Sequence, residues 1–413
     1  MTRPIRVLVP YMATFFGGVR QLLGLGMPLL SRAPGFRVTY SELCSNDADM
    51  DAMERAGVEV DRHLGVPGPG ALSMRGGWRR GLDIAAQAPR LARIAWRMAA
   101  RLSDYDICYV HGHRELLLAI AARAAARLPR PPAIVWHWHG PPLSVAADAR
   151  NAEAARLLVR LASPSCARVI AISDFSAGEA RDMGVDPERL VTVLNAASVS
   201  EDASGATAPQ PLPARSADQV TLLLPCAAIR RHKGVHLAVE ALRHVSPDSV
   251  LWITGDPADP LAAEYVDELR KMAARAQVSD RVHFIDARRD LHRVMSSADI
   301  VLVPSVWQEP FGLVAAEAQL LGVPVIASNR GALPELMGNG RLGLVFDAED
   351  PATLATAINR MSRDPDLRAR IASAARTHAE LRYSYERWSR ELASVLGEVA
   401  DRRRIASLEP AQG

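Results

Sequence analysis

Short runs of apolar, mostly β-branched residues recur along the chain and alternate with longer stretches of helical periodicity. The clearest runs lie at 5–10, 37–43, 107–110 and 133–136, and again at 220–226, 250–254, 281–285 and 299–304. Uninterrupted apolar runs are typical of strands that are buried on both faces of a parallel sheet. Their alternation with helices predicts an α/β protein that contains two doubly wound, Rossmann-like parallel sheets.

The two series of strands are separated by a segment rich in Ala, Pro, Ser and Gly, a composition typical of linkers. A chain of 413 residues is also too long for a single hydrophobic core. We therefore predict an N-terminal domain at 1–200, a linker at 201–218, a C-terminal domain at 219–383, a final helix at 384–404 and a disordered tail at 405–413.

The stretch from Glu309 to Glu317 carries the strongest chemical signal. It follows the apolar run 299–304, and Pro310 suits the start of a helix because its missing N–H would be unpaired there. The amides of Phe311, Gly312 and Leu313 would then form an anion site that a phosphate can approach closely at the glycine. Carboxylates flank this site, which suits a sugar nucleotide, although a buried αβ unit with two surface glutamates is the simpler alternative.

Two further segments join a strand to a helix in a way that suits phosphate. Arg230 and Lys233 lie between the run 220–226 and an amphipathic helix, and a solvated basic loop is the alternative. Gly17 and Gly18 lie between the first strand and the first helix, where a tight turn explains the glycine pair equally well.

Histidines follow two neighbouring strands of the first series. His111 and His113 come after 107–110, and His137 and His139 come after 133–136. Ligands of open α/β sheets bind at the carboxyl ends of strands, so the pairing favours a functional role, although each histidine alone is more often structural. A His-x-His pair can also bind metal. With no cysteine or acidic third ligand nearby in the sequence, we expect no metal site.

Charge and composition exclude other classes of protein. The net charge of +3 argues against general nucleic-acid binding, and four scattered cysteines predict neither a zinc site nor a disulfide framework. The acidic run Asp47-x-Asp49-x-Asp51 could bind a divalent metal and a nucleotide, but an acid-rich helix N-terminus explains it better. The N-terminus does not resemble a signal peptide and no run is long enough to span a membrane, so we expect a cytoplasmic protein.

The most basic region of the chain is a predicted helix with an arginine stripe. A solvated face is the simpler interpretation, and a contact with anionic lipid at the inner face of the membrane, or with an acidic acceptor, is the alternative. The stripe consists of Arg90, Arg93, Arg97 and Arg101.

The stretch from Glu309 to Glu317 resembles the Glu-x7-Glu signature of family-4 glycosyltransferases, which have the GT-B fold. The resemblance continues through 322–326 (Gly-Val-Pro-Val-Ile) and 331–335 (Gly-Ala-Leu-Pro-Glu), and 106–111 resembles the family's Asp-x-x-x-x-His strand. It implies a retaining hexosyltransferase of glycan biosynthesis. Such an enzyme takes a nucleotide-diphosphate sugar, needs no metal or other cofactor, and uses a glycan, lipid-linked or small-molecule hydroxyl acceptor.

The resemblance also implies roles for individual residues. His139, Glu309 and Lys233 would be catalytic, with His139 and Glu309 at the sugar and Lys233 at the diphosphate. Glu317 would bind the ribose, and the final helix would cross back to the first domain. The other donor-binding residues would be Gly17, Gly18, Arg230, Gly255, Asp286, Phe311, Gly312 and Leu313.

Two departures from the family pattern leave alternatives open. Ala228 stands where a Gly-Arg pair is usual, so Arg230 would have to replace the arginine, and Ser198 stands in place of a usual acidic residue. Another GT-B enzyme, such as a nucleotide-sugar epimerase or a phosphorylase, is one alternative. A non-catalytic GT-B scaffold that binds a sugar nucleotide or a partner is the other.

Overall fold

The computed structural model divides into two compact units, each built around one parallel sheet. Residues up to Asn195 and those from Tyr385 onward form the first unit, and Ala196–Ser384 form the second. The described residues are 3–12, 18–44, 47–66, 79–141, 149–199, 212–216, 218–256, 259–260, 262–285 and 290–408. Most of the predicted linker, 201–211 and 217, lies outside them.

The sheet of the first unit has seven strands, in the order β3-β2-β1-β4-β5-β6-β7, and all of its pairs are parallel. The strand order reverses between β1 and β4, which is where doubly wound sheets bind their ligands. The strands are β1 (Ile5–Tyr11), β2 (Phe36–Glu42), β3 (Glu59–Val60), β4 (Ile107–Val110), β5 (Ala133–Trp138), β6 (Cys166–Ala171) and β7 (Leu190–Thr192). Strand β5 runs two residues further than predicted and therefore includes His137.

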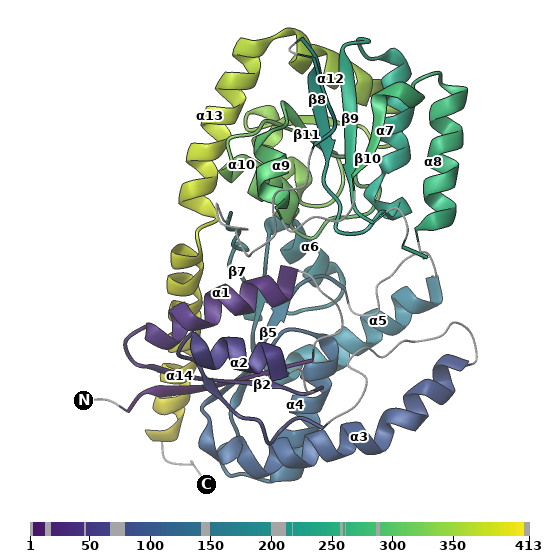
Figure 1. The fold of residues 1–413 in the computed structure, drawn as a ribbon. Coiled ribbons are helices and arrows are strands. Elements are labelled where there is room, and N and C mark those ends of the chain that lie inside the picture. Colours follow the sequence, from purple (N-terminus) through teal and green to yellow (C-terminus); the bar gives the residue numbers. More distant parts are fainter. Residues whose placement is uncertain are drawn as a thin grey trace. The chain divides into compact units, whose positions relative to one another are not determined.

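Helices from both ends of the chain cover this sheet. The N-terminal ones are α1 (Gly18–Arg32), α2 (Asp47–Arg55), α3 (Arg79–Arg101), α4 (His113–Ala126), α5 (Ala149–Ala162) and α6 (Asp174–Asp182). The last helix, α14 (Tyr385–Leu408), packs against α1 and β5 and lies beside α1 in Figure 1. Because α14 continues to Leu408, the prediction of a disordered tail is wrong for 405–408. Residues 409–413 lie outside the described range.

A close contact between α14 and α1 explains a glycine in the first helix. Trp388 of α14 is fully buried, and its ring lies so near Gly26 that an added Cβ would come within 2.3 Å of Trp388 Cζ3. Gly24 lies in the same helix, but a Cβ there would meet nothing within 4 Å. Trp388 can therefore pack at this place only because residue 26 of α1 has no side chain.

The sheet of the second unit has six strands in the equivalent order, β10-β9-β8-β11-β12-β13, again with parallel pairs. Strands β8, β9 and β10 lie side by side in Figure 1. The strands are β8 (Val220–Leu224), β9 (Ser249–Thr254), β10 (Val282–Ile285), β11 (Ile300–Val303), β12 (Val325–Ser328) and β13 (Leu344–Phe346). The helices are α7 (Val235–Ala241), α8 (Ala263–Arg275), α9 (Leu291–Ser296), α10 (Leu313–Leu320), α11 (Leu333–Leu336), α12 (Pro351–Arg363) and α13 (Pro365–Arg382). Two doubly wound sheets of this kind confirm the predicted fold class.

The acidic run after β2 opens a helix, as the sequence indicated. Helix α2 begins at Asp47, and Asp49 forms an ion pair with Arg20 of α1. Negative charge at this end complements the partial positive charge of a helix N-terminus. The arrangement accounts for the run without a metal.

Three arginines of the predicted stripe on α3 bind groups of their own unit. Arg90 donates to the carbonyl of Val66, and Arg97 donates to that of Gly65. Arg101 forms an ion pair with the buried carboxylate of Asp61 at 3.0 Å. These contacts hold the segment after β3 against the helix, which favours a structural role for the stripe. The membrane contact stays a prediction.

All four cysteines are buried and free, as expected from their spacing. Within the described part of the chain, no helix is both long enough and apolar enough to cross a membrane.

Candidate functional site

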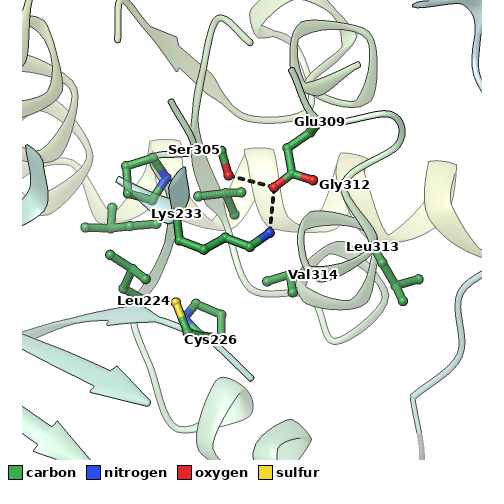
Figure 2. Close-up of a pocket in the computed structure, with 12 residues that line it drawn as sticks. Leu224, Cys226, Lys233, Ser305, Glu309, Gly312, Leu313 and Val314 are labelled. Atoms are coloured by element: carbon green, nitrogen blue, oxygen red, sulfur yellow. Dashed lines mark hydrogen bonds and ion pairs between the residues drawn. The ribbon is translucent and has the colours of Figure 1, made fainter. Parts of the chain in front are cut away.

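A pocket opens where the strand order of the second sheet reverses, between the carboxyl ends of β8 and β11. Its volume is about 120 Å³. Figure 2 shows the side chains of Lys233, Ser305 and Glu309 converging in it. The complete lining is Leu224, Pro225, Cys226, Lys233, Leu302, Val303, Pro304, Ser305, Glu309, Gly312, Leu313 and Val314.

Glu309 is the buried anion of this pocket, with a relative exposure of 8%. Its Oε1 accepts a hydrogen bond from Lys233 Nζ at 2.8 Å and another from Ser305 Oγ at 2.7 Å. Burial by itself raises the pKa of a carboxyl group, but the charge and hydrogen bond of Lys233 and the hydroxyl of Ser305 outweigh it. The net result is a Glu309 pKa below its usual value. The carboxylate is therefore ionised at neutral pH despite its burial.

A glycine loop fixes the backbone of Glu309. The amide of Ala332 donates to the Glu309 carbonyl at 2.8 Å, and the amide of Gly331 donates to the side chain of Gln308 at 2.6 Å. Gly331 has a φ of +61°, and a Cβ there would come within 2.3 Å of the Glu309 nitrogen. The motif at 331–335 thus holds the acidic loop, and only glycine fits at its first position.

Lys233 reaches the pocket because the next residue allows a close passage of the backbone. Gly234 has a φ of +69°, and a Cβ there would come within 1.7 Å of the carbonyl oxygen of Pro304, at the end of β11. The ammonium group also lies 5.7 Å from the centre of the Trp307 ring, within the range of a cation–π interaction. The sequence did not predict three of these site residues, which are Ser305, Trp307 and Gly331. Gly331 nevertheless belongs to the motif at 331–335.

The helix beside the pocket begins later than predicted. Helix α10 starts at Leu313, so Pro310 lies in the preceding loop, and Gly312 takes the N-cap position with a φ of +99°. The first amides of any helix have no acceptor within the helix, and here they border the pocket. Phe311 is buried and packs at a right angle against Tyr383, with ring centres 5.5 Å apart, and serves as an apolar anchor.

Glu317 lies on α10 and is buried, with a relative exposure of 6%. Its Oε2 is 3.7 Å from Nε2 of His292 on α9, a separation that gives an ion pair when the imidazole is protonated. Lys233 and Glu309 thus share one pocket, and Glu317 lies further along the helix that borders it.

The remaining predicted donor residues, from both units, have other surroundings. Arg230 forms an ion pair with Asp259 at 2.7 Å, so its guanidinium group is already engaged. Gly255 follows β9 with a φ of +128° and lets that loop pass Ile229 closely. Asp286 lies outside the described residues, as does Gly17, whereas Gly18 is the first residue of α1.

Three of the four predicted histidines come together in the first unit. His111 Nδ1 lies 3.0 Å from His139 Nε2, and Tyr109 Oη lies 2.5 Å from His137 Nδ1. His137 and His139 have ring centres 4.4 Å apart. His113 instead begins α4 and lies outside this cluster. The third histidine comes from the neighbouring parallel strand, so the sequence argument against a third ligand does not hold.

The cluster is buried and its rings are neutral at physiological pH. His111 and His137 are 4% and 0% exposed, and His139 is half-buried. Burial lowers the pKa of all three, in the case of His139 to about 3. Since His111 engages Nε2 of His139, the nitrogen of His139 left for another partner is Nδ1. The buried Nε2 atoms of His111 and His137 have no hydrogen-bond partner.

Family models match both halves of the chain. Residues 213–378 match the family described as "Glycosyl transferases group 1", and residues 32–196 match the "Glycosyl transferase 4-like domain". Among solved structures, the fold is similar to that of HepE from Anabaena in complex with UDP and glucose. The TM-score is 0.73, with 22% identity over 95% of this chain and 100% of that one. Sucrose-phosphate synthase from Thermosynechococcus elongatus has a TM-score of 0.69, 17% identity, and coverage of 96% and 100%. These likenesses confirm the GT-B fold.

Curated relatives match over part of their length. A D-inositol 3-phosphate glycosyltransferase of Streptomyces bingchenggensis is 31% identical over 56% of this chain and 53% of its own length. The enzyme of the same name from Corynebacterium glutamicum is 38% identical over 39% of each chain. Spore coat protein SA of Bacillus subtilis is 30% identical over 42% of this chain and 48% of its own. The matches thus span about half, or less, of each relative.

Proposed function

Because the chain belongs to the family-4-like glycosyltransferases with the GT-B fold, we propose that it transfers a hexosyl group from a nucleotide-diphosphate sugar to a hydroxyl acceptor. The observation that carries this proposal is the pocket at the β8–β11 reversal, where Lys233 is ion-paired with a buried, ionised Glu309 beside the first turn of α10. A cation and free helix amides suit the diphosphate, and a carboxylate suits a sugar hydroxyl.

The residues of this pocket divide into a part for the leaving group and a part for the sugar. Lys233 and the first amides of α10 would stabilise the negative charge that develops on the departing diphosphate, a form of electrostatic catalysis. Glu309 would accept from a hydroxyl of the transferred sugar, Glu317 would accept from the ribose, and His139 would bind the sugar or the acceptor. The chain's own cations and amides could then supply the charge stabilisation, and we propose transfer with retention and without a catalytic metal.

The ion pair has a consequence for donor binding. Lys233 Nζ is 2.8 Å from Glu309 Oε1, so a diphosphate has to share or replace the carboxylate as partner of the ammonium group. Arg230 has to leave Asp259 to take part, which makes Lys233 the first cation for the diphosphate. We propose a UDP-sugar as the first donor to test, because the structurally similar HepE has been crystallised with UDP and with UDP-glucose. The acceptor in this proposal is a hydroxyl group of a glycan, a lipid-linked sugar or a small molecule.

Binding of the donor is tested by thermal unfolding with UDP-, GDP- and ADP-sugars. A ligand at about 100 times its dissociation constant stabilises the folded state by about 2.7 kcal/mol. Lys233→Ala and Glu317→Ala should each weaken binding of the matching nucleoside diphosphate by roughly 1.5–3 kcal/mol, the value of a charged hydrogen bond. Lys271→Ala, on the exposed side of α8, is the control. Unchanged binding in both site variants would refute the donor site.

Turnover is tested separately from binding. Glu309→Gln should keep or improve affinity for the nucleoside diphosphate, because it releases Lys233, while transfer falls by roughly two to three orders of magnitude. His139→Ala should also keep its affinity and lose transfer. Full transfer by His139→Ala with loss in His137→Ala would reassign the sugar contact. Binding without transfer or hydrolysis in the unaltered protein would favour the non-catalytic scaffold, and a changed sugar in the free nucleotide would favour an epimerase.

A further inference from the structure

The histidine cluster of the first unit has a geometry that the proposed sugar contact does not require. His139 alone would serve that contact, yet His111 and His137 converge on it from β4 and β5. One potential ligand nitrogen from each ring lies within 4.8 Å of the other two.

The pairwise geometry is close to that of a metal site. A tetrahedral zinc ion with nitrogens at about 2.0–2.1 Å holds any two of them roughly 3.3 Å apart. His111 Nδ1 and His139 Nε2 are already 3.0 Å apart, at a position where an ion can replace the proton that the two rings now share. The ligand nitrogens of all three rings lie within 4.8 Å of one another, so the His137 nitrogen has to approach the other two by at most about 1.5 Å to reach the zinc spacing.

The ring of His137 contacts Tyr109 through one nitrogen, and its other nitrogen remains available. Tyr109 Oη contacts His137 Nδ1, so Nε2 is the atom of His137 that can bind an ion, and this buried nitrogen has no partner. Buried polar atoms are nearly always paired, so an unpartnered one needs an explanation. Tyr109 is fully buried and neutral, and its oxygen can accept from Nδ1–H once Nε2 is coordinated. Metal-bound histidines usually have such an outer partner on their second nitrogen.

We propose that His111, His137 and His139 form a binding site for a divalent transition-metal ion, with Zn²⁺ as the ion that best suits three neutral imidazoles. His139 is half-buried, and its exposed side gives an ion a path of entry and leaves the fourth position to water or another ligand. The site is not part of the donor chemistry proposed above. Zinc would occupy Nε2 of His139 and leave Nδ1, the nitrogen available to another partner, unoccupied.

Metal binding by the full-length protein tests the site without any donor or acceptor, so its outcome does not depend on the proposed function. The chelator-treated protein should bind one equivalent of Zn²⁺ in calorimetry. It should also bind one equivalent of Co²⁺, with the visible absorption of a low-coordinate cobalt site. His137→Gln and His111→Asn should each weaken binding at least tenfold. His113→Ala is the matched control, because this histidine lies two residues from His111 but outside the cluster, and it should bind as the unaltered protein does.

Tyr109→Phe tests the outer partner and keeps the proposal testable if a histidine variant fails to fold. It preserves all three rings and should weaken zinc binding by roughly 10–100-fold, the effect expected for the loss of an outer-shell hydrogen bond. Circular dichroism establishes that each variant is folded. Absence of stoichiometric binding by the unaltered protein overturns the proposal, as does equal binding in a folded His137→Gln variant. Either result would leave the cluster as a hydrogen-bonded group of neutral imidazoles.

Discussion

Replacing Lys233 with methionine should destabilise the second unit by an amount that depends on pH. The carboxylate of Glu309 is 8% exposed and has Lys233 as its charged partner. Removal of one partner from a buried ion pair costs about 3–5 kcal/mol, because a charge is left buried and uncompensated. The Lys233 side chain is 34% exposed, so solvent screens part of the interaction. We therefore expect a loss of about 2–3 kcal/mol at pH 7.

The pH dependence follows from the direction of the Glu309 pKa. In the unaltered protein this pKa lies below its unfolded value, so the group adds stability above the unfolded pKa, and that stability is lost as the pH falls through the folded pKa. Without Lys233, burial becomes the dominant influence and raises the pKa above the unfolded value. The variant can then protonate Glu309 in the folded state, so its deficit should shrink as the pH falls from about 7 to about 4.

Urea unfolding at several pH values measures this effect. Lys271→Met, which removes an exposed lysine of α8, controls for the change in side-chain type and should be nearly neutral throughout. The double variant Lys233→Met/Glu309→Gln removes the buried charge as well and should recover most of the stability lost at pH 7. A deficit that is the same at pH 7 and pH 4, or a double variant no more stable than Lys233→Met, would refute the idea that uncompensated burial is the cause.

Three other predictions concern glycines and one half-buried acid, Glu179. Gly26→Ala should destabilise the first unit by about 1–3 kcal/mol through overpacking against the α14 tryptophan. Gly24→Ala, in the same helix with open space around it, should add roughly 0.5–1 kcal/mol, and equal effects in urea unfolding would contradict this. Gly331→Ala should displace the Glu309 loop and lower transfer more than thermal stability, as turnover and melting measurements would show. Burial raises the pKa of Glu179 to about 7, so its folded form is destabilised as the pH rises from about 4.5 to 7. Glu179→Gln should remove that loss of stability, unlike the exposed control Glu188→Gln.

Much of the fold was predictable because buried parallel strands leave a strong apolar signature. The run at 299–304 corresponds to β11 and the run at 107–110 to β4, within one residue at each end. The final helix was predicted at its start, but its end was placed at Arg404, although Pro410 is a stop signal just after the observed end at Leu408. Short apolar runs thus located strands well, whereas this helix end was placed too early.

The candidate site was predictable in its residues but not in its contacts. The motif containing Glu309 and the basic loop containing Lys233 were both recognised, but each was assigned to a different part of the donor. Their ion pair joins positions 76 residues apart, and no local pattern encodes it. The histidines at the ends of two neighbouring strands were also recognised, but the contact of three of their rings was not, because one ring comes from the end of β4 and two come from β5 and its end. Pairing between strands, rather than spacing in the sequence, brings such groups together.

The return of the last helix to the first unit sets an order of events during protein synthesis. Arg403 of α14 donates to the carbonyl of Asp106, 297 positions earlier, and Arg404 donates to that of Arg3, 401 positions earlier. A ribosome adds about 5–20 residues per second, so roughly 20–80 s pass between the synthesis of the N-terminal strands and the synthesis of this helix. The second unit is one continuous segment and can complete its contacts first. We expect the surface of α1 around Gly26 to stay uncovered during this interval, because Trp388 has not yet been made.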